Sequence, residues 1–188
     1  KKIIPKSKLL LYGKNNSIYE EHPNFNIRGV DCSTGSLGHG LSFGIGISIS
    51  NNLLNKKGNI IVLMSDGECN EGSVWEAAGF ATAQKLSNLI VLIDSNKWQA
   101  TGRSKEIFGG DLKKKWEAFG WKTVSINGHN YFQILKSLKI AKESKRPCAI
   151  IANTVKGKGI EFMEDDNNWH YRIPNREELK NIKKMLNI

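Results

Sequence analysis

Four short runs of apolar, mostly β-branched residues are spaced along the chain, and segments with helical spacing of apolar residues lie between them. This alternation is typical of βα units wound around a parallel sheet. The chain is therefore predicted to have an α/β fold. The predicted strands are Asn59–Met64, Asn88–Asp94, Lys122–Ile126 and Cys148–Thr154.

The remaining patterned segments predict helices. Ser73–Leu86 carries an apolar stripe at helical spacing, and Ser73 is a suitable N-cap. Leu37–Leu54 is rich in glycine and other small residues, which suits a helix packed closely against a neighbouring backbone. The other predicted helices are Leu112–Phe119, Tyr131–Glu143 and a terminal amphipathic helix over Arg176–Asn187.

Length and composition are those of one globular unit. A chain of 188 residues fits a single domain, and 39% hydrophobic with 24% charged residues argues against disorder and against a membrane span. The net charge of +10 comes from lysines that are scattered and have no interleaved aromatic residues. This scatter favours a solvated surface over nucleic-acid binding.

The cysteines bear on the expected localisation of the chain, and its first residue bears on the expected extent of the domain. Cys32, Cys69 and Cys148 stand far apart and form no CxxC pair, so neither a zinc site nor a disulfide framework is indicated. We therefore expect a reducing, cytoplasmic localisation. The chain begins at Lys1 without an initiator Met. We expect residues 1–188 to form one domain that is incomplete at its N-terminus.

Two polar positions follow consecutive predicted strands. Asp66 comes after the first strand and Asn96 after the second, a separation suited to one strand–helix–strand passage. Ligands of open parallel sheets bind beyond the carboxyl ends of the strands, so both side chains are expected in one place. Carboxylate and amide oxygens suit Mg²⁺ bound to phosphate oxygens. Gly67 would let the backbone approach that anion.

At these residues the chain resembles a known pattern. Ser65-Asp66-Gly67 followed by Asn96 is similar to the thiamine-diphosphate signature, which opens with Gly-Asp-Gly and closes with Asn. The first glycine is replaced by Ser65 in this chain. The wider stretch Ser65–Gly102 resembles the transketolase version of the signature. The resemblance covers most of residues 22–175.

The resemblance implies a three-layer, parallel-sheet thiamine diphosphate-binding fold, the pyrophosphate-binding domain of the family. It further implies that Asp66, the Asn96 side chain and the main-chain carbonyl of Trp98 bind Mg²⁺. Gly67 would contact the diphosphate, and Asp66, Glu68 and Asn96 would be further cofactor-binding residues.

Two flanking segments extend the resemblance. Gly35-Ser36-Leu37-Gly38-His39-Gly40 is similar to the transketolase loop beside the aminopyrimidine ring, which makes Gly35, Ser36 and Leu37 cofactor contacts. Val155–His170 resembles the segment that ends in a catalytic, cofactor-contacting histidine, here His170. Glu71 would lie at a dimer interface. His22 has an ambiguous role, and His129 is predicted to be a turn residue without a catalytic part.

The implied activity is transfer of a two-carbon ketol unit from a ketose phosphate to an aldose, with thiamine diphosphate and Mg²⁺. In this family the glutamate that activates the cofactor belongs to a second domain. We therefore expect a partner, a C-terminal transketolase subunit with the pyrimidine-binding domain, in a homodimer of heterodimers, unless the chain is a fragment. No membrane association is expected.

Two alternatives stay open from the sequence. One is another thiamine diphosphate enzyme, such as a deoxyxylulose-phosphate synthase or a 2-oxo acid dehydrogenase component, because these share the metal signature. The other is a non-catalytic module that keeps the fold and binds partners through its basic surface.

Overall fold

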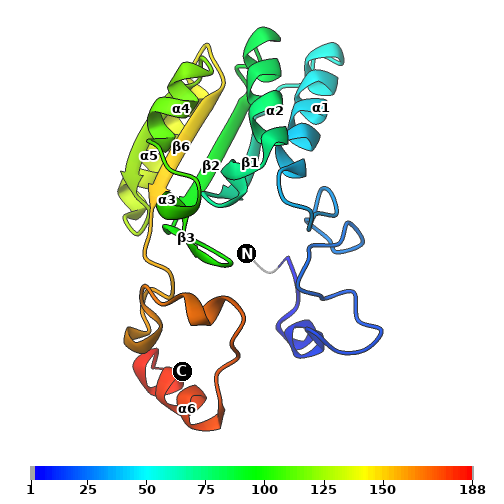
Figure 1. Ribbon diagram of the computed structural model, residues 1–188. Helices are drawn as coiled ribbons and strands as arrows, with labels where there is room; N and C mark the ends of the chain where they lie inside the picture. Colours follow the sequence, from blue (N-terminus) through cyan, green and yellow to red (C-terminus); the bar gives the residue numbers. More distant parts are fainter. Residues whose placement is uncertain (1–2, 188) are drawn as a thin grey trace.

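A parallel sheet of four strands forms the centre of the computed structural model, which describes residues 3–187 (Figure 1). The strand order is β1-β2-β6-β5, so the last strand in sequence lies inside the sheet. Each strand begins and ends within one residue of its predicted bounds. The strands are β1 (Ile60–Ser65), β2 (Leu89–Ser95), β5 (Lys122–Asn127) and β6 (Cys148–Asn153). The predicted α/β fold with a parallel sheet is confirmed.

All five predicted helices are present, and each ends one to three residues earlier than predicted. They are α1 (His39–Leu53), α2 (Gly72–Ala83), α4 (Leu112–Ala118), α5 (Tyr131–Lys142) and α6 (Arg176–Met185). Asn130 caps α5, and Asn175 with Glu178 forms a capping box at α6.

The prediction that Ser73 caps α2 is wrong. The N-cap is Glu71, whose backbone is extended, and Ser73 lies inside the helix. The predicted end at Leu86 is also wrong, because Lys85 adopts a left-handed conformation with φ 54°. The Leu86 N–H then bonds the Ala81 carbonyl at 3.1 Å, which satisfies a helix-end acceptor and buries Leu86.

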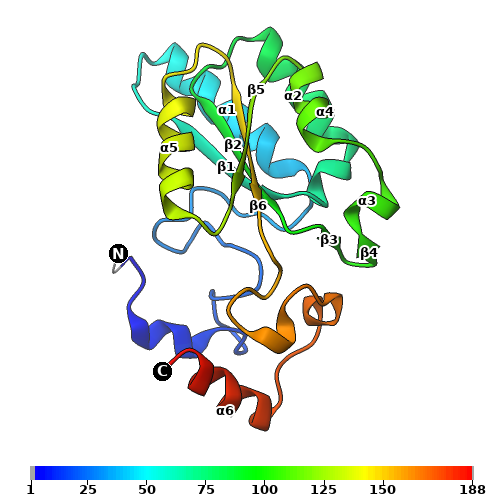
Figure 2. The same ribbon diagram turned by 90° about the vertical axis from the view of Figure 1, so that its left-hand side faces the viewer.

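Helices cover the two faces of the sheet unequally (Figure 2). One face packs against α1, α2 and α4, and the other packs against α5. Successive β2 residues alternate between the two cores, with Val91 and Ile93 in the first and Ile90 in the second. Trp116 and Trp121 are fully buried in the first core and meet edge to face at 4.8 Å.

On the face of the sheet where α5 packs, the side chains of β1 are exposed. Leu63 is 70% exposed and Ile61 is 49% exposed, whereas Val62 and Met64 on the opposite face are buried. The reason is that α5 packs on β5 and β6, at the other edge of the sheet.

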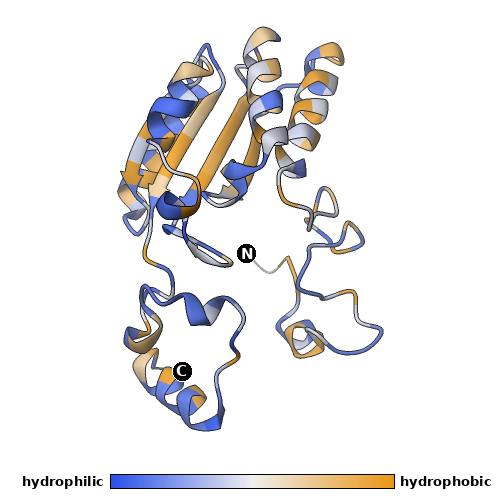
Figure 3. Ribbon diagram, viewed as in Figure 1, coloured by the Kyte–Doolittle hydropathy of each residue, from blue (hydrophilic) through white to orange (hydrophobic). Residues whose placement is uncertain are grey.

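Two long segments lie beyond the carboxyl ends of the strands (Figure 1). Residues 3–38 contain only the short η1 (Lys6–Leu11), and residues 154–187 contain η3 (Glu161–Met163), η4 (Asn167–His170) and α6. They are much more hydrophilic than the sheet (Figure 3). No helix within residues 3–187 is long and apolar enough to cross a membrane.

Several short elements near the strand ends are not predicted by the sequence pattern. They are η2 (Glu68–Asn70), the two-stranded hairpin β3 (Trp98–Gln99) with β4 (Gly102–Arg103), and α3 (Ser104–Ile107). Each is at most four residues long, too short for apolar periodicity to reveal.

The close packing of α1 on β1 gives a stability prediction. A Cβ at Gly44 would lie 2.5 Å from Val62 Cγ2, whereas a Cβ at Gly46 would have no atom within 4 Å. Gly44→Ala should therefore lower the free energy of unfolding by about 1–3 kcal/mol through overpacking. Gly46→Ala, its matched control, should raise it by about 0.5–1 kcal/mol. Urea unfolding checks both, and equal effects would contradict the described packing.

Candidate functional site

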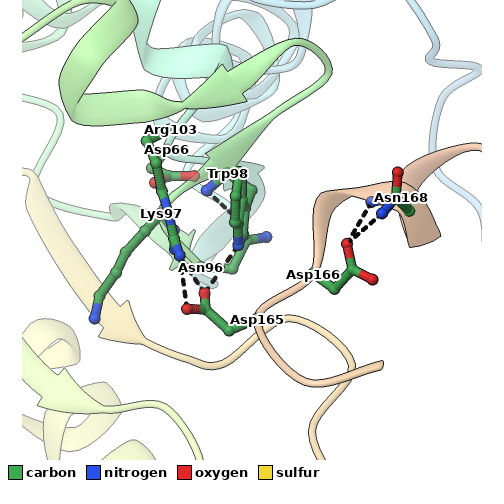
Figure 4. A network of polar contacts seen from close by, with 8 residues as sticks. All are labelled: Asp66, Asn96, Lys97, Trp98, Arg103, Asp165, Asp166 and Asn168. Atoms are coloured by element: carbon green, nitrogen blue, oxygen red, sulfur yellow. Dashed lines mark hydrogen bonds and ion pairs between the residues drawn. The ribbon is translucent and has the colours of Figure 1, made fainter. Parts of the chain in front are cut away.

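The carboxylate of Asp66 lies at the carboxyl ends of β1 and β2. Ser65 pairs with Asp94 in the sheet, and the Asp66 N–H donates to the Asp94 carbonyl at 3.1 Å. The Asp66 side chain accepts hydrogen bonds from the N–H of Lys97 and the N–H of Gly67, each at 3.0 Å. The first of these contacts draws the turn after β2 onto Asp66 (Figure 4).

Burial controls the electrostatics of Asp66. The residue is only 7% exposed, and this desolvation raises the pKa of Asp66 above its ordinary value. The Ser104 hydroxyl and the N–H groups of Lys97 and Gly67 lower the pKa of Asp66, while the nearby charge of Asp94 adds to its rise. A cation beside this carboxylate would offset the cost of burying its charge.

The turn Asn96–Trp98 holds the other two predicted metal ligands. The Asn96 Oδ1 accepts from the Trp98 N–H at 2.9 Å, and Lys97 between them has φ 72°. Asn96 lines a cleft of about 700 Å³ together with Asp94 and Thr154. Asp66 lines a smaller hollow of about 270 Å³ on its own side of this turn. The Lys97 N–H bond thus links Asp66 to the turn that carries Asn96, while the two residues line different hollows.

The donor atoms available here suit one kind of cation. Within residues 3–187, no group of three His, Cys, Asp or Glu side chains could hold a metal ion. The predicted ligands Asp66, the Asn96 amide and the Trp98 carbonyl would instead supply hard oxygen atoms only, with a single carboxylate. Mg²⁺ accepts such a set when phosphate oxygens and water complete its shell.

Polar side chains around Asp66 and Gly67 have unused hydrogen-bonding atoms. In the described part of the chain, Asn70 Nδ2 and Gln99 Nε2 are buried without a hydrogen-bond partner, while the Ser104 hydroxyl lies near Asp66 and lowers its pKa. Asn70 and Ser104 line the same hollow as Asp66. A Cβ at Gly67 would come within 2.9 Å of Gln99 Cγ. Unpaired buried donors of this kind fit a site that takes up a polar ligand.

Ser65 and Glu68 organise the loop after β1. Ser65 ends β1 in an extended conformation, which any residue adopts, and its Oγ accepts from the Glu68 N–H at 3.0 Å. Replacement of the signature glycine by Ser65 is therefore accommodated. The Glu68 carboxylate in turn accepts from the Gly38 N–H at 2.8 Å. Gly38 has φ 83° and contacts Glu71 and Ser73 so closely that a Cβ would not fit.

The predicted cofactor loop Gly35, Ser36 and Leu37 is exposed and precedes α1. His22 packs directly on it, because a Cβ at Gly35 would lie 2.9 Å from His22 Cγ. The Thr34 N–H also donates to the Pro23 carbonyl at 3.2 Å. The structure thus places His22 beside this loop, a neighbourhood that its sequence position alone did not define.

His170 and His129 are placed in different surroundings. His170 ends η4 on the segment beyond the strand ends, is exposed, and meets Tyr171 edge to face at 4.6 Å. His129 lines the cleft that contains Asn96, and its Nε2 accepts from the Val155 N–H at 2.8 Å. Its turn, Asn127–Asn130, gave no sign of this long-range contact.

Cys69 lies in η2, directly after Asp66 and Gly67, but its thiol is unreactive. It is 1% exposed, and burial raises the pKa of its thiol to about 12. The thiol therefore stays protonated at neutral pH and is not a nucleophile.

A family model described as "Transketolase, thiamine diphosphate binding domain" matches residues 7–188. The chain belongs to the transketolase family. The structure agrees with this assignment, since it superimposes on transketolase from Campylobacter jejuni with a TM-score of 0.90 and 33% identity, covering 97% of this chain and 30% of that one.

Its relatives within the transketolase family include separate subunits. An apulose-4-phosphate transketolase subunit of Actinobacillus succinogenes is 40% identical over 179 residues, which are 94% of this chain and 65% of that protein. A 6-deoxy-6-sulfo-D-fructose transketolase subunit of a Clostridium species is 41% identical over 138 residues, which are 72% of this chain and 50% of that protein. The chain thus spans about two thirds or less of these relatives.

The Glu68 contact generates a prediction about the loop before α1. Glu68→Ala removes the acceptor of the Gly38 N–H, so it should lower the free energy of unfolding by about 1.5–3 kcal/mol and speed hydrogen exchange at Gly38. Glu68→Gln keeps an acceptor oxygen and should lose less. Glu76→Ala, at an exposed carboxylate of α2, is the control. Unaltered exchange at Gly38 in Glu68→Ala would show that the contact is dispensable.

Proposed function

We propose that this chain is the N-terminal part of a transketolase that uses thiamine diphosphate and Mg²⁺ to transfer a two-carbon ketol unit from a ketose phosphate to an aldose. The observation that carries the proposal is the buried Asp66 carboxylate, bonded to the turn that holds Asn96 and Trp98. Family membership supports the same function.

Three groups of this chain would hold the metal: the Asp66 carboxylate, the Asn96 amide oxygen and the Trp98 carbonyl. Gly67 would face the diphosphate, since it has no side chain to block the approach, and Glu68 would be a further cofactor contact next to it. The unpaired Asn70 amide is a further donor near this anion. Each of these groups is on the turns after β1 and β2, so the sheet itself sets their spacing.

Gly35, Ser36 and Leu37 would contact the organic part of the cofactor. The bond from Gly38 to Glu68 supports this role, because it ties their loop to the turn that carries Asp66 and Gly67. When bound, thiamine diphosphate supplies an electron sink for a carbanion next to a former carbonyl. His170, with an exposed imidazole, would hold or move a proton at the substrate hydroxyl.

The proposed reaction needs groups from outside residues 1–188. We infer a partner, a C-terminal transketolase subunit that carries the pyrimidine-binding domain and the activating glutamate. Relatives named as transketolase subunits support this inference. The assembly would be a homodimer of heterodimers with the exposed Glu71 at an interface, acting on sugar phosphates. Three free cysteines fit a cytoplasmic setting.

Activity should depend on the partner. We expect no ketol transfer from xylulose 5-phosphate to ribose 5-phosphate by the chain alone, and turnover when its partner is added. A coupled spectrophotometric assay measures this, with pyruvate as the competing donor. Robust turnover by the isolated chain would refute the partner requirement. Turnover of pyruvate alone would favour another thiamine diphosphate enzyme, and failure to bind cofactor even with the partner would favour a non-catalytic module.

Loss of the Asp66 carboxylate should abolish Mg²⁺-dependent cofactor retention. Asp66→Ala removes the only carboxylate of the proposed metal set, so calorimetry of the assembled protein should detect no cofactor binding that depends on Mg²⁺. Glu143→Ala, at an exposed carboxylate just after α5, should bind like the unaltered protein. Equal cofactor affinity in Asp66→Ala and Glu143→Ala would mean that the metal lies elsewhere.

A further inference from the structure

Asp165 joins two parts of the chain that are distant in sequence. Its carboxylate accepts hydrogen bonds from both terminal nitrogens of the Arg103 guanidinium group, at 2.6 and 2.7 Å (Figure 4). It also accepts one from the Trp98 Nε1–H at 2.9 Å. The Arg103 Cζ lies 3.7 Å from the centre of the Trp98 ring. Both partners belong to the β3–β4 hairpin, where Trp98 pairs with Arg103. We call these three residues the Asp165 clamp.

The clamp differs from the other ion pairs. Its charged members are 62 positions apart, whereas the other three pairs within residues 3–187 join residues four or six positions apart. The two-point bond from guanidinium to carboxylate also fixes orientation, which a single contact to lysine does not. A second polar contact, from Asn167 Nδ2 to the Ala100 carbonyl at 3.2 Å, reaches the same hairpin.

Asp165 is presented by a closed loop. The Asp165 N–H donates to the Lys156 carbonyl at 2.9 Å, and Lys158 pairs with Glu164 at 3.0 Å. Gly157, at φ 74°, packs so closely on the Met163 backbone that no Cβ would fit. These contacts close the loop that carries the Asp165 carboxylate. His170 follows five residues later, so the clamp also anchors the segment that carries this histidine.

We propose that Asp165 is a positioning residue that, through Arg103 and the Trp98 ring, holds the hairpin so that the Trp98 carbonyl stays in place for the metal. This inference rests on the proposed function. Asp165 would not touch substrate, cofactor or metal. The hairpin has only two residues in each strand, so its own ladder is too short to keep this geometry.

The test follows two readouts in the chain assembled with its C-terminal partner. Mg²⁺ is titrated while cofactor retention is followed by quenching of tryptophan fluorescence, and hydrogen exchange is measured over residues 98–103. Asp165→Ala should raise the half-saturating Mg²⁺ concentration about 10- to 100-fold, the usual effect of losing a residue that supports a metal ligand. Exchange over the hairpin should become faster, with the core unaffected.

Matched variants separate positioning from folding. Arg103→Met removes the ion pair but leaves the Trp98 Nε1–H bond to Asp165, so it should show the same changes to a smaller extent. The double variant should be no worse than Asp165→Ala, because the Arg103 ion pair is already lost there. Asp165→Glu keeps the carboxylate and should recover part of the Mg²⁺ affinity. Glu117→Gln breaks an exposed ion pair on α4 and should change neither readout.

The outcomes are distinct. An unchanged hairpin exchange rate, or faster exchange with unchanged Mg²⁺ dependence, overturns the positioning role. If the unaltered assembly retains cofactor equally well without Mg²⁺, the metal part of the proposed function fails, and the role of the clamp fails with it. If only the variants lose Mg²⁺ affinity, both proposals are supported.

Discussion

The hydrogen bond from the Lys97 N–H to the Asp66 carboxylate is the contact on which the rest of the site depends. A buried carboxylate has to be paired, and parallel pairing of β1 with β2 brings a backbone donor to it. That pairing also draws in Asn96 and Trp98, because they flank Lys97. The sheet thus supplies the geometry, while short turns supply the chemical groups.

The loops around this point are held by a few specific contacts. Glu68 fixes Gly38, His22 rests on Gly35, and His129 accepts from Val155. Each contact ties a segment beyond the strand ends to a turn of the sheet or to a neighbouring loop. A rigid scaffold with loops attached at defined points suits a site that must close around a cofactor.

The sequence was sufficient where structure is encoded locally. Apolar runs located all four sheet strands within a residue, and their order placed Asp66 and Asn96 at one edge. Prediction from the sequence failed where contacts between distant residues determine the conformation. The β3–β4 hairpin, for example, is linked to Asp165 across 62 positions, and the left-handed Lys85 that ends α2 is not a residue that ordinarily signals a helix stop. The separate hollows of Asp66 and Asn96 were equally invisible from strand order.

The position of β6 bears on how the chain folds. β6 is the last of the four sheet strands to be synthesised, yet it pairs with both β2 and β5, and β5 has no other neighbour in the sheet. Until residue 153 has left the ribosome, β5 has no strand to pair with, and of the four sheet strands only β1 and β2 can pair with each other. Assembly of the fold is therefore a late event, governed by contacts between remote segments.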